Sequence, residues 1–141
     1  MERASVITIG NRIDNSSVVA ETDPSKGSNL AKYVTKTIEL NDSSDGLKLY
    51  LDINRPNGSF VDVYHKTGNT AGTFDTGSWV AMTPDGNNGQ VAYSDGTTYQ
   101  ETSFNATVAP FTVFAIKIVM RSNSTSTIPM CQDLRAIALR V

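Results

Sequence analysis

The strongest constraint on the fold is a stretch of eight residues, 47–54, in which apolar side chains alternate with polar or aromatic ones. The side chains that share one face of this stretch in an extended chain are Leu47, Leu49, Leu51 and Ile53. An α-helix would distribute these side chains around its axis, whereas a β-strand places them on one side. The stretch therefore predicts a β-strand with one buried face.

A second strand-like run, residues 59–66, follows directly after the turn-forming residues Arg55, Pro56, Asn57 and Gly58. Pro56 presets φ for a turn, and the Asn-Gly pair tolerates a left-handed conformation. A β-hairpin is the economical interpretation, and the alternative is a four-residue connection that crosses between two packed sheets. Either arrangement places the only histidine, His65, in a strand.

Other segments have the composition or alternation of strands. They are residues 4–9, 32–40, 79–82, 90–93, 98–104, 111–120 and 134–141. Residues 111–120 are largely apolar on both faces, which is typical of a central strand, and residues 133–140 contain enough Ala and Leu for a short helix as the alternative. About eight or nine strands predict an all-β fold, an antiparallel β-sandwich with jelly-roll-like connections. A closed barrel of the same strands is the alternative.

A chain of 141 residues is long enough for one domain with a single core. Residues 1–30 are expected to form an N-terminal strand and an extended arm, because residues 11–31 lack a sustained period and contain many turn formers. Residues 31–141 are expected to form the β-sandwich domain. The apolar side chains of the arm are the candidate interface residues, since they gain little from a short aperiodic segment unless another surface covers them. They are Ile13, Val18, Val19 and Leu30. The alternative is that the arm folds back on its own domain.

Charged residues make up 18% of the chain, against about 25% in an average domain. The net charge of −2 argues against nucleic acid and anionic membranes as partners, because both require a basic surface. We find no apolar run long enough to cross a membrane, and the first ten residues are too polar for a signal peptide, so we expect synthesis in the cytoplasm. The single cysteine, Cys131, excludes an internal disulfide and is expected to be a small buried hydrophobe.

The candidate chemistry is sparse. His65 has no serine or cysteine nucleophile in a recognisable context, so a structural or surface histidine is expected. Residues 85–89 imitate the start of a calcium loop, but their glycine stands fifth instead of sixth and the final glutamate is missing. The sequence therefore predicts a protein that is not an enzyme, with no catalytic residue, no metal ligand and no cofactor.

Three aromatic residues form a candidate platform on which a sugar ring could stack. They are Trp79, Tyr93 and Tyr99. Flat aromatic rings combined with neutral amides are the usual device of lectin-like sandwiches. The alternative for Trp79 is an ordinary core position.

Several segments together carry a resemblance to a known family. They are residues 21–28 (ETDPSKGS), 31–40 (AKYVTKTIEL), 47–59 (LKLYLDINRPNGS), 61–66 (VDVYHK), 74–82, 111–120 and 133–139. From Glu21 onward the chain resembles a module of virion proteins of tailed bacteriophages, especially marine and cyanobacterial phages. In such modules the position of His65 is commonly tyrosine.

The resemblance implies a non-enzymatic virion structural protein of the tail, baseplate, neck or a head-attached appendage, which assembles through protein–protein interfaces. Its partners would be other virion proteins and copies of itself, without nucleic acid or membrane, and it would reside in the virion. The outward faces of the first two runs, including Tyr50 and Asp52, are then expected to contact neighbours. A receptor-contacting, glycan-binding module is the alternative function. The resemblance implies no catalytic or cofactor residues.

Overall fold

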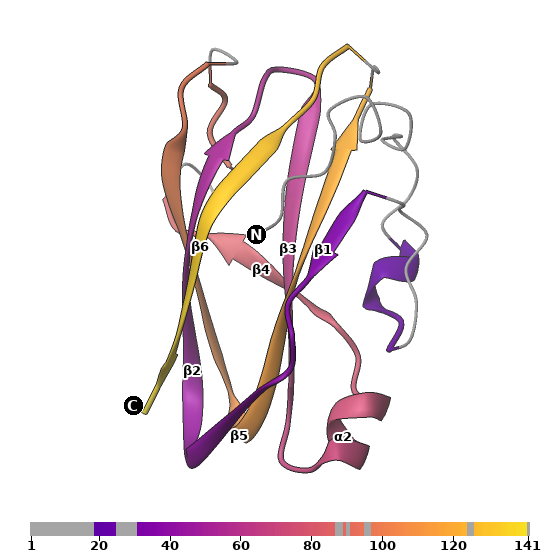
Figure 1. The fold of residues 1–141 in the computed structure, drawn as a ribbon, viewed down its shortest axis with the longest axis vertical. Coiled ribbons are helices and arrows are strands. Elements are labelled where there is room, and N and C mark those ends of the chain that lie inside the picture. Colours follow the sequence, from indigo (N-terminus) through magenta and orange to yellow (C-terminus); the bar gives the residue numbers. More distant parts are fainter. Residues whose placement is uncertain are drawn as a thin grey trace.

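The computed structural model describes residues 19–24, 31–86, 89, 91–94, 97–123 and 126–140. These residues form six antiparallel strands, one 3-10 helix and one short α-helix (Figure 1). The elements are η1 Val19–Thr22, β1 Lys32–Val34, β2 Ile38–Asn54, β3 Ser59–Gly68, α2 Ala71–Thr76, β4 Val80–Pro84, β5 Gln100–Ser122 and β6 Met130–Leu139. The prediction of an all-β, antiparallel fold is confirmed, and the jelly-roll connectivity stays a prediction.

The strands form one sheet with the order β3-β4-β5-β2-β6, in which β1 also pairs with β5. Residues 100–107 of β5 pair with the second half of β2, whereas residues 113–122 of β5 pair with β3. Both long strands bend sharply at one end of the molecule (Figure 1), where the register of β2 shifts between Glu39 and Gly46. The sheet therefore folds over into two layers, with β2, β6 and the start of β5 in the first and β3 and the end of β5 in the second.

One side of this folded sheet is closed and the other is open. Residues 80–82 of β4 pair with β3, and residues 83–84 then pair with β5, so β4 passes from the second layer to the first. At the opposite end of the strand order, β6 pairs with β2 alone among the described residues. The described strands are therefore closed like a barrel only at β4 and are open like a sandwich at β6.

The main core lies between the two layers. Its buried members are Leu47, Leu49, Leu51, Ile53, Val61, Val63, Met82, Val91, Phe104, Phe111, Phe114, Ile116 and Ile118. The four alternating side chains that predicted the first strand are at most 2% exposed. Each such side chain is worth roughly 1.5–3 kcal/mol relative to an exposed one, so the alternation of β2 contributes directly to the stability of the core.

The structure has fewer strands than predicted, because some of the expected strands are parts of longer ones. Residues 98–104 and 111–120 were expected as two strands, but β5 runs through Pro110 without interruption. The proline is tolerated because it lies at the bend, where the register of β2 against β5 is irregular and a ladder hydrogen bond is not required. Residues 91–93 form no strand, and the predicted strand 32–40 is divided between β1 and β2. The predicted strand at residues 4–9 lies outside the described residues.

The hairpin prediction is wrong, and the alternative connection is present. Both edges of β2 are occupied, one by β5 and the other by β6, so β3 cannot pair with it. The chain instead crosses between the layers through a turn in which Gly58 has φ 89° and the Ser59 N–H donates to the Pro56 carbonyl at 3.1 Å. Gly58 takes the left-handed conformation that the Asn-Gly pair tolerates, but the turn does not specify which strand becomes the neighbour.

Residues 67–78, which lie between the predicted strands 59–66 and 79–82, contain helix α2. The helix begins at an N-cap, Thr70, that forms a reciprocal capping box with Thr73. Phe74 of the helix lies so close to the end of β3 that a Cβ on Gly68 would be 2.7 Å from the Phe74 nitrogen. A glycine at position 68 is therefore what allows the helix to pack on this strand.

The alternative of a short helix near the C-terminal end is not observed, because Met130–Leu139 pairs with β2 as a strand. In the part of the chain that the structure describes, no helix has the length and apolar character needed to span a membrane.

Candidate interaction surfaces

The outer face of the second layer carries a separate set of buried side chains, which we call the outer cluster. Its members are Tyr64, Phe74, Trp79, Val113, Ala115 and Val119. Lys66 and Lys117 lie on the same face and are only 4% and 2% exposed. The Lys117 ammonium lies 4.9 Å from the centre of the Trp79 ring and 5.0 Å from that of Tyr64. Cation–π contacts thus hold two lysines among aromatic rings.

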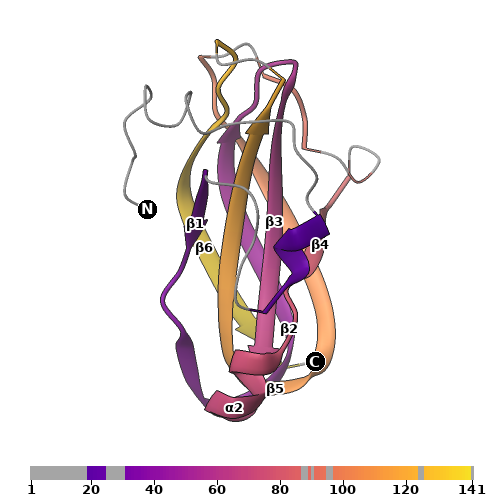
Figure 2. The same cartoon turned by 90° about the vertical axis from the view of Figure 1, so that its right-hand side faces the viewer.

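Residues 19–24, which include η1, pass over the face of β3 that carries the outer cluster, and Figure 2 shows η1 beside β3. The Glu21 side chain is fully buried, and its Oε2 lies 3.0 Å from the ammonium of Lys117 and 3.4 Å from that of Lys32. Lys117 also donates to the Glu21 carbonyl at 2.6 Å, and Lys66 donates to the Pro24 carbonyl at 3.0 Å. This part of the predicted arm therefore lies on its own domain.

This contact does not test the candidate interface residues of the arm. Ile13, Val18 and Leu30, and the side chain of Val19, lie outside the described residues.

Burial and charge act in opposite directions in the outer cluster. Burial lowers the pKa of Lys117, and the hydrogen bond and charge of Glu21 raise it. Burial, together with the carboxylates of Asp62 and Glu21, raises the pKa of Tyr64 to about 12. The cluster is therefore an ion pair sealed between aromatic rings, and Glu21 is the group that keeps the Lys117 charge compensated.

A pocket of about 450 Å³ opens where β4 leaves β3 to join the first layer. We call it the Arg55 pocket, because the Arg55 guanidinium forms one wall and is buried. That guanidinium donates to the Ser59 and Val91 carbonyls and stacks at 4.3 Å on the ring of Tyr93, which is 54% exposed. Asp62, also in the wall, accepts from the Arg121 Nε at 2.6 Å. The pocket thus combines an exposed aromatic ring with charged groups.

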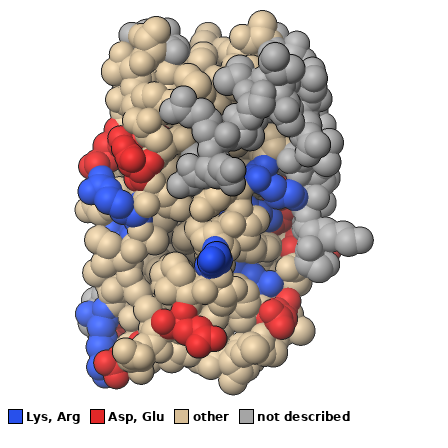
Figure 3. Space-filling view, in the orientation of Figure 1, with Lys and Arg blue, Asp and Glu red and all other residues tan. Residues whose placement is uncertain are grey.

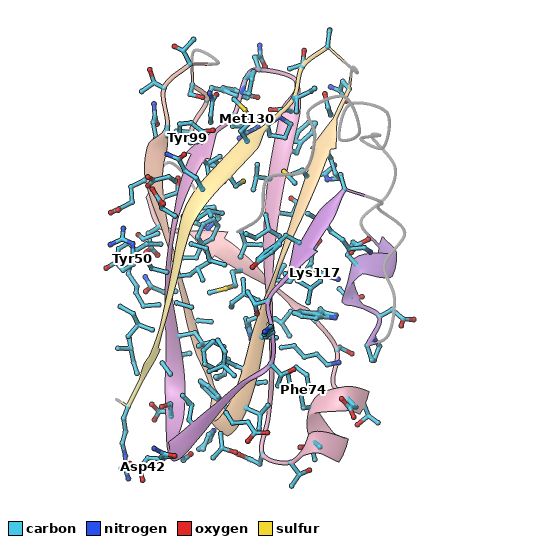
Figure 4. All side chains as sticks on the ribbon, in the orientation of Figure 1. Asp42, Tyr50, Phe74, Tyr99, Lys117 and Met130 are labelled. Carbon is cyan, nitrogen blue, oxygen red and sulfur yellow. The ribbon has the colours of Figure 1, made fainter. Side chains whose placement is uncertain are left out.

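The three residues of the predicted sugar platform lie in different surroundings. Trp79 is buried in the outer cluster, as its core alternative predicts. Tyr93 lines the Arg55 pocket. Tyr99, labelled in Figure 4, is half-buried just before β5, and it is not among the residues that line the pocket. A sugar site on this chain would therefore depend on Tyr93, without the indole ring.

The outer face of the first layer is polar and internally paired. The Tyr50 ring points away from β2 (Figure 4), with the Lys48 ammonium at 5.5 Å and the Arg135 guanidinium at 5.1 Å from its centre. Arg135 also pairs with Glu101. On the side of the molecule that Figure 3 shows, described basic and acidic side chains are intermixed and do not gather in a patch of one sign.

The open edge of β6 carries the most exposed apolar side chains of this layer, Ile137 at 47% and Leu139 at 40%. In the sheet, Leu139 stands opposite Gly46, which offers no side chain to cover it. At the other end of the strand, Asp133 has φ 52°, and the pairing with β2 is irregular there. The regular part of the edge therefore runs from residue 134 to residue 139.

The groups considered for catalysis occupy structural positions. His65 is 4% exposed, and its Nδ1 has no hydrogen-bond partner in the structure as described. Burial raises the pKa of the Cys131 thiol to about 12, so it is not a reactive thiolate. Within the described ranges, no group of three or more His, Cys, Asp or Glu side chains could hold a metal ion.

Sequence reasoning missed Glu21 and the two lysines of the outer cluster. One signal was present, because Lys117 is the lone charge in a segment that is apolar on both faces. Such a charge requires a buried partner, but nothing local to Lys117 identifies Glu21.

No protein-family model matches the chain, and no curated protein matches it. Among solved structures, the chain is similar to the D431N mutant VP2 protein of infectious bursal disease virus in derived T=1 particles. The TM-score is 0.39 and the sequence identity is 15%. The similarity covers 84% of this chain and 35% of the VP2 chain, so this chain spans about a third of the length of that protein.

Proposed function

We propose that this chain is a non-enzymatic virion structural protein that assembles through protein–protein interfaces into a tail, baseplate, neck or head-attached appendage. The single observation that carries the proposal is the open edge of β6, with Ile137 and Leu139 exposed beside it. The resemblance of the sequence to virion modules of tailed bacteriophages supports the virion as the place of assembly.

Among the described residues, the edge of β6 lacks most of the devices that keep strands apart. An unpaired edge is a template for another strand, and monomeric proteins usually blunt it with lysine, proline, a bulge or a covering segment. Residues 134–139 contain neither lysine nor proline, and the bulge at Asp133 lies before them. The partners we propose are therefore protein strands from other virion proteins or from copies of this chain, and not nucleic acid or membrane.

The proposal is tested by replacing Leu139 with lysine and measuring incorporation of the chain into particles by quantitative mass spectrometry. The matched control is Val80→Lys, because Val80 is 50% exposed and lies on β4, which pairs with β3 at this residue and with β5 at its end. We expect L139K to reduce incorporation and V80K to leave it unchanged. The absence of the wild-type chain from purified particles would overturn the proposal.

A glycan-binding role is the second candidate, and the exposed Tyr93 ring at the Arg55 pocket favours it. A sugar ring stacks on a flat aromatic face while charged groups accept and donate hydrogen bonds at its hydroxyls. Tyr93→Ala should then weaken binding on a glycan array at least several-fold, whereas Tyr99→Ala should not. An array without any signal for the wild-type chain would exclude this role.

A further inference from the structure

We propose that β6 pairs antiparallel with β6 of a second copy of this chain, across a two-fold axis at Ala138. Two folded sheets would become continuous through their open edges. The inference rests on the proposed structural function and deepens it by naming the partner and the register. A two-fold axis through antiparallel strands presents the same edge from both copies, so no second surface has to be matched.

The register follows from the exposed apolar side chains. With Ala138 on the axis, Ile137 lies opposite Leu139 of the second copy, and Leu139 lies opposite Ile137. Residues directly opposite in an antiparallel pair lie on the same face of the sheet, with Cβ atoms about 4.5–5.5 Å apart. Both exposed side chains are therefore covered, including Leu139, which has only Gly46 beside it within its own sheet.

Neighbouring registers fit less well. An axis at Ile137 places Leu139 opposite Arg135, whose guanidinium already pairs with Glu101 and stacks on Tyr50. An axis at Ala136 extends the pairing to Asp133, where φ of 52° interrupts the regular strand. Because a bulge of this kind terminates regular pairing, the C-terminal half of β6 is the part available to a partner.

Charge and size are also compatible with a second copy. In the proposed register Arg140 lies opposite Ala136, so no two like charges face each other across the described part of the pair. Alanines at positions 136 and 138 place small side chains on the inner face next to the axis. In this register the two Ala138 side chains face each other at the axis, so no bulky pair has to be accommodated on the inner face.

The contact is short, because the regular edge ends at residue 139. A specific, stable interface usually buries about 1,200–2,000 Å², and one pair of half-strands provides less. We therefore expect a dimer that forms at high protein concentration and is strengthened when many copies are held together in an assembly.

The register is tested by disulfide cross-linking in a Cys131→Ala background, with the two chains carrying tags of different mass. We expect the mixture of Ile137→Cys and Leu139→Cys chains to form a mixed disulfide dimer under oxidation. Each variant alone should cross-link several-fold less, because position 137 faces position 139. Val80→Cys mixed with Leu139→Cys is the control for random collisions, since Val80 is equally exposed.

Each outcome separates the inference from the proposed function. Predominant self-cross-linking of Ile137→Cys would overturn this register, and no cross-link above the Val80→Cys control would overturn the two-fold pairing. If L139K still prevents incorporation into particles in that case, the function stands and the edge has another partner, such as another virion protein or residues 4–9 of the same chain. Circular dichroism of each variant verifies that the domain is folded.

Discussion

Strand β3 and the second half of β5, residues 111–122, bury both of their faces, and the two faces are built in different ways. The inner face meets the other layer of the sheet, and most of its buried side chains are aliphatic or phenylalanine, with His65 as a buried polar group among them. The outer face is covered by η1, α2 and Trp79, and it contains two lysines, a tyrosine and a buried glutamate. The inner face is stabilised by apolar burial, whereas the outer face also depends on each buried charge having a partner.

The two faces should also open at different free energies. Opening the inner core separates long strands that pair over most of their length, so it requires global unfolding. The cover of the outer cluster at Glu21 is attached through a few ion pairs and hydrogen bonds, such as that from the Trp79 N–H to the Thr22 carbonyl at 3.1 Å. We expect this cover to open locally, at a lower free energy than the rest of the domain.

The largest effect is expected from a cavity in the inner core. Phe104 is 1% exposed, and Phe104→Ala should lower the free energy of unfolding by about 3–5 kcal/mol. Urea denaturation measures the change, with the exposed Val80→Ala as the control. A loss near 1 kcal/mol would show that the two layers collapse around the missing ring, and it would contradict the expected cavity.

A smaller effect is expected from removing the charge that neutralises Lys117. Glu21→Gln leaves the buried ammonium without its carboxylate, and breaking a buried pair in this way costs up to about 3–5 kcal/mol. Local opening of residues 19–24 lets the lysine reach water and limits the loss, so we expect about 3 kcal/mol or less. Urea denaturation measures stability, and hydrogen exchange at Trp79 reports the local opening.

The control for this prediction replaces both partners. Glu21→Gln combined with Lys117→Met removes both charges of the Glu21–Lys117 pair, and apolar replacement of buried pairs is often neutral or stabilising. We expect the double variant to recover most of the stability lost in the single one. A double variant as unstable as Glu21→Gln would mean that the glutamate acts through its packing, and not through the ion pair.

The same contrast explains which parts of the fold could be predicted from the sequence alone. The alternation at residues 47–54 and the apolar run at 111–120 predicted the inner face, because strand periodicity is a local property. The choice of neighbour is not local. Residues 55–58 have good turn chemistry, yet β2 is flanked by β5 and β6, which come later in the chain.

The outer cluster was beyond sequence analysis for a related reason. Glu21 and Lys117 are 96 positions apart, so neither residue indicates the other. Trp79 was ambiguous between a sugar platform and a core position because exposure, and not residue type, separates the two. The open edge of β6 was likewise invisible until the order of the strands was known.

The buried His65 on the inner face of β3 should make the stability of the domain depend on pH. Burial lowers its pKa below the ordinary value of 6.5, so the folded state resists a proton that the unfolded state accepts. Stability is therefore highest above pH 6.5 and falls as the pH drops below it, until the lowered folded-state pKa is reached. We expect His65→Leu to remove this part of the pH dependence in urea titrations. Equal slopes for both proteins between pH 5 and about 6.5 would contradict it.

The smallest effect is expected at the solvent-exposed ion pair between Lys48 and Asp85, which can be compared with the buried pair of Glu21 and Lys117. Asp85 Oδ2 accepts from Lys48 at 2.8 Å, Ser103 at 2.7 Å and Asn105 at 2.6 Å, and these bonds, Lys48 first, lower the pKa of Asp85. Its side chain is 36% exposed, so solvent screens the pair and Asp85→Asn should cost less than about 1 kcal/mol. The contribution of the Asp85 pair to stability is present above the ordinary carboxyl pKa and is lost as the pH falls through the lowered one.

Added salt should reduce the effect of Asp85→Asn and leave that of Glu21→Gln nearly unchanged, because exposed pairs are screened far more than buried ones. Equal salt sensitivity of the two variants in urea denaturation would show that Glu21 is hydrated, and the distinction between the buried and the exposed pair would fail.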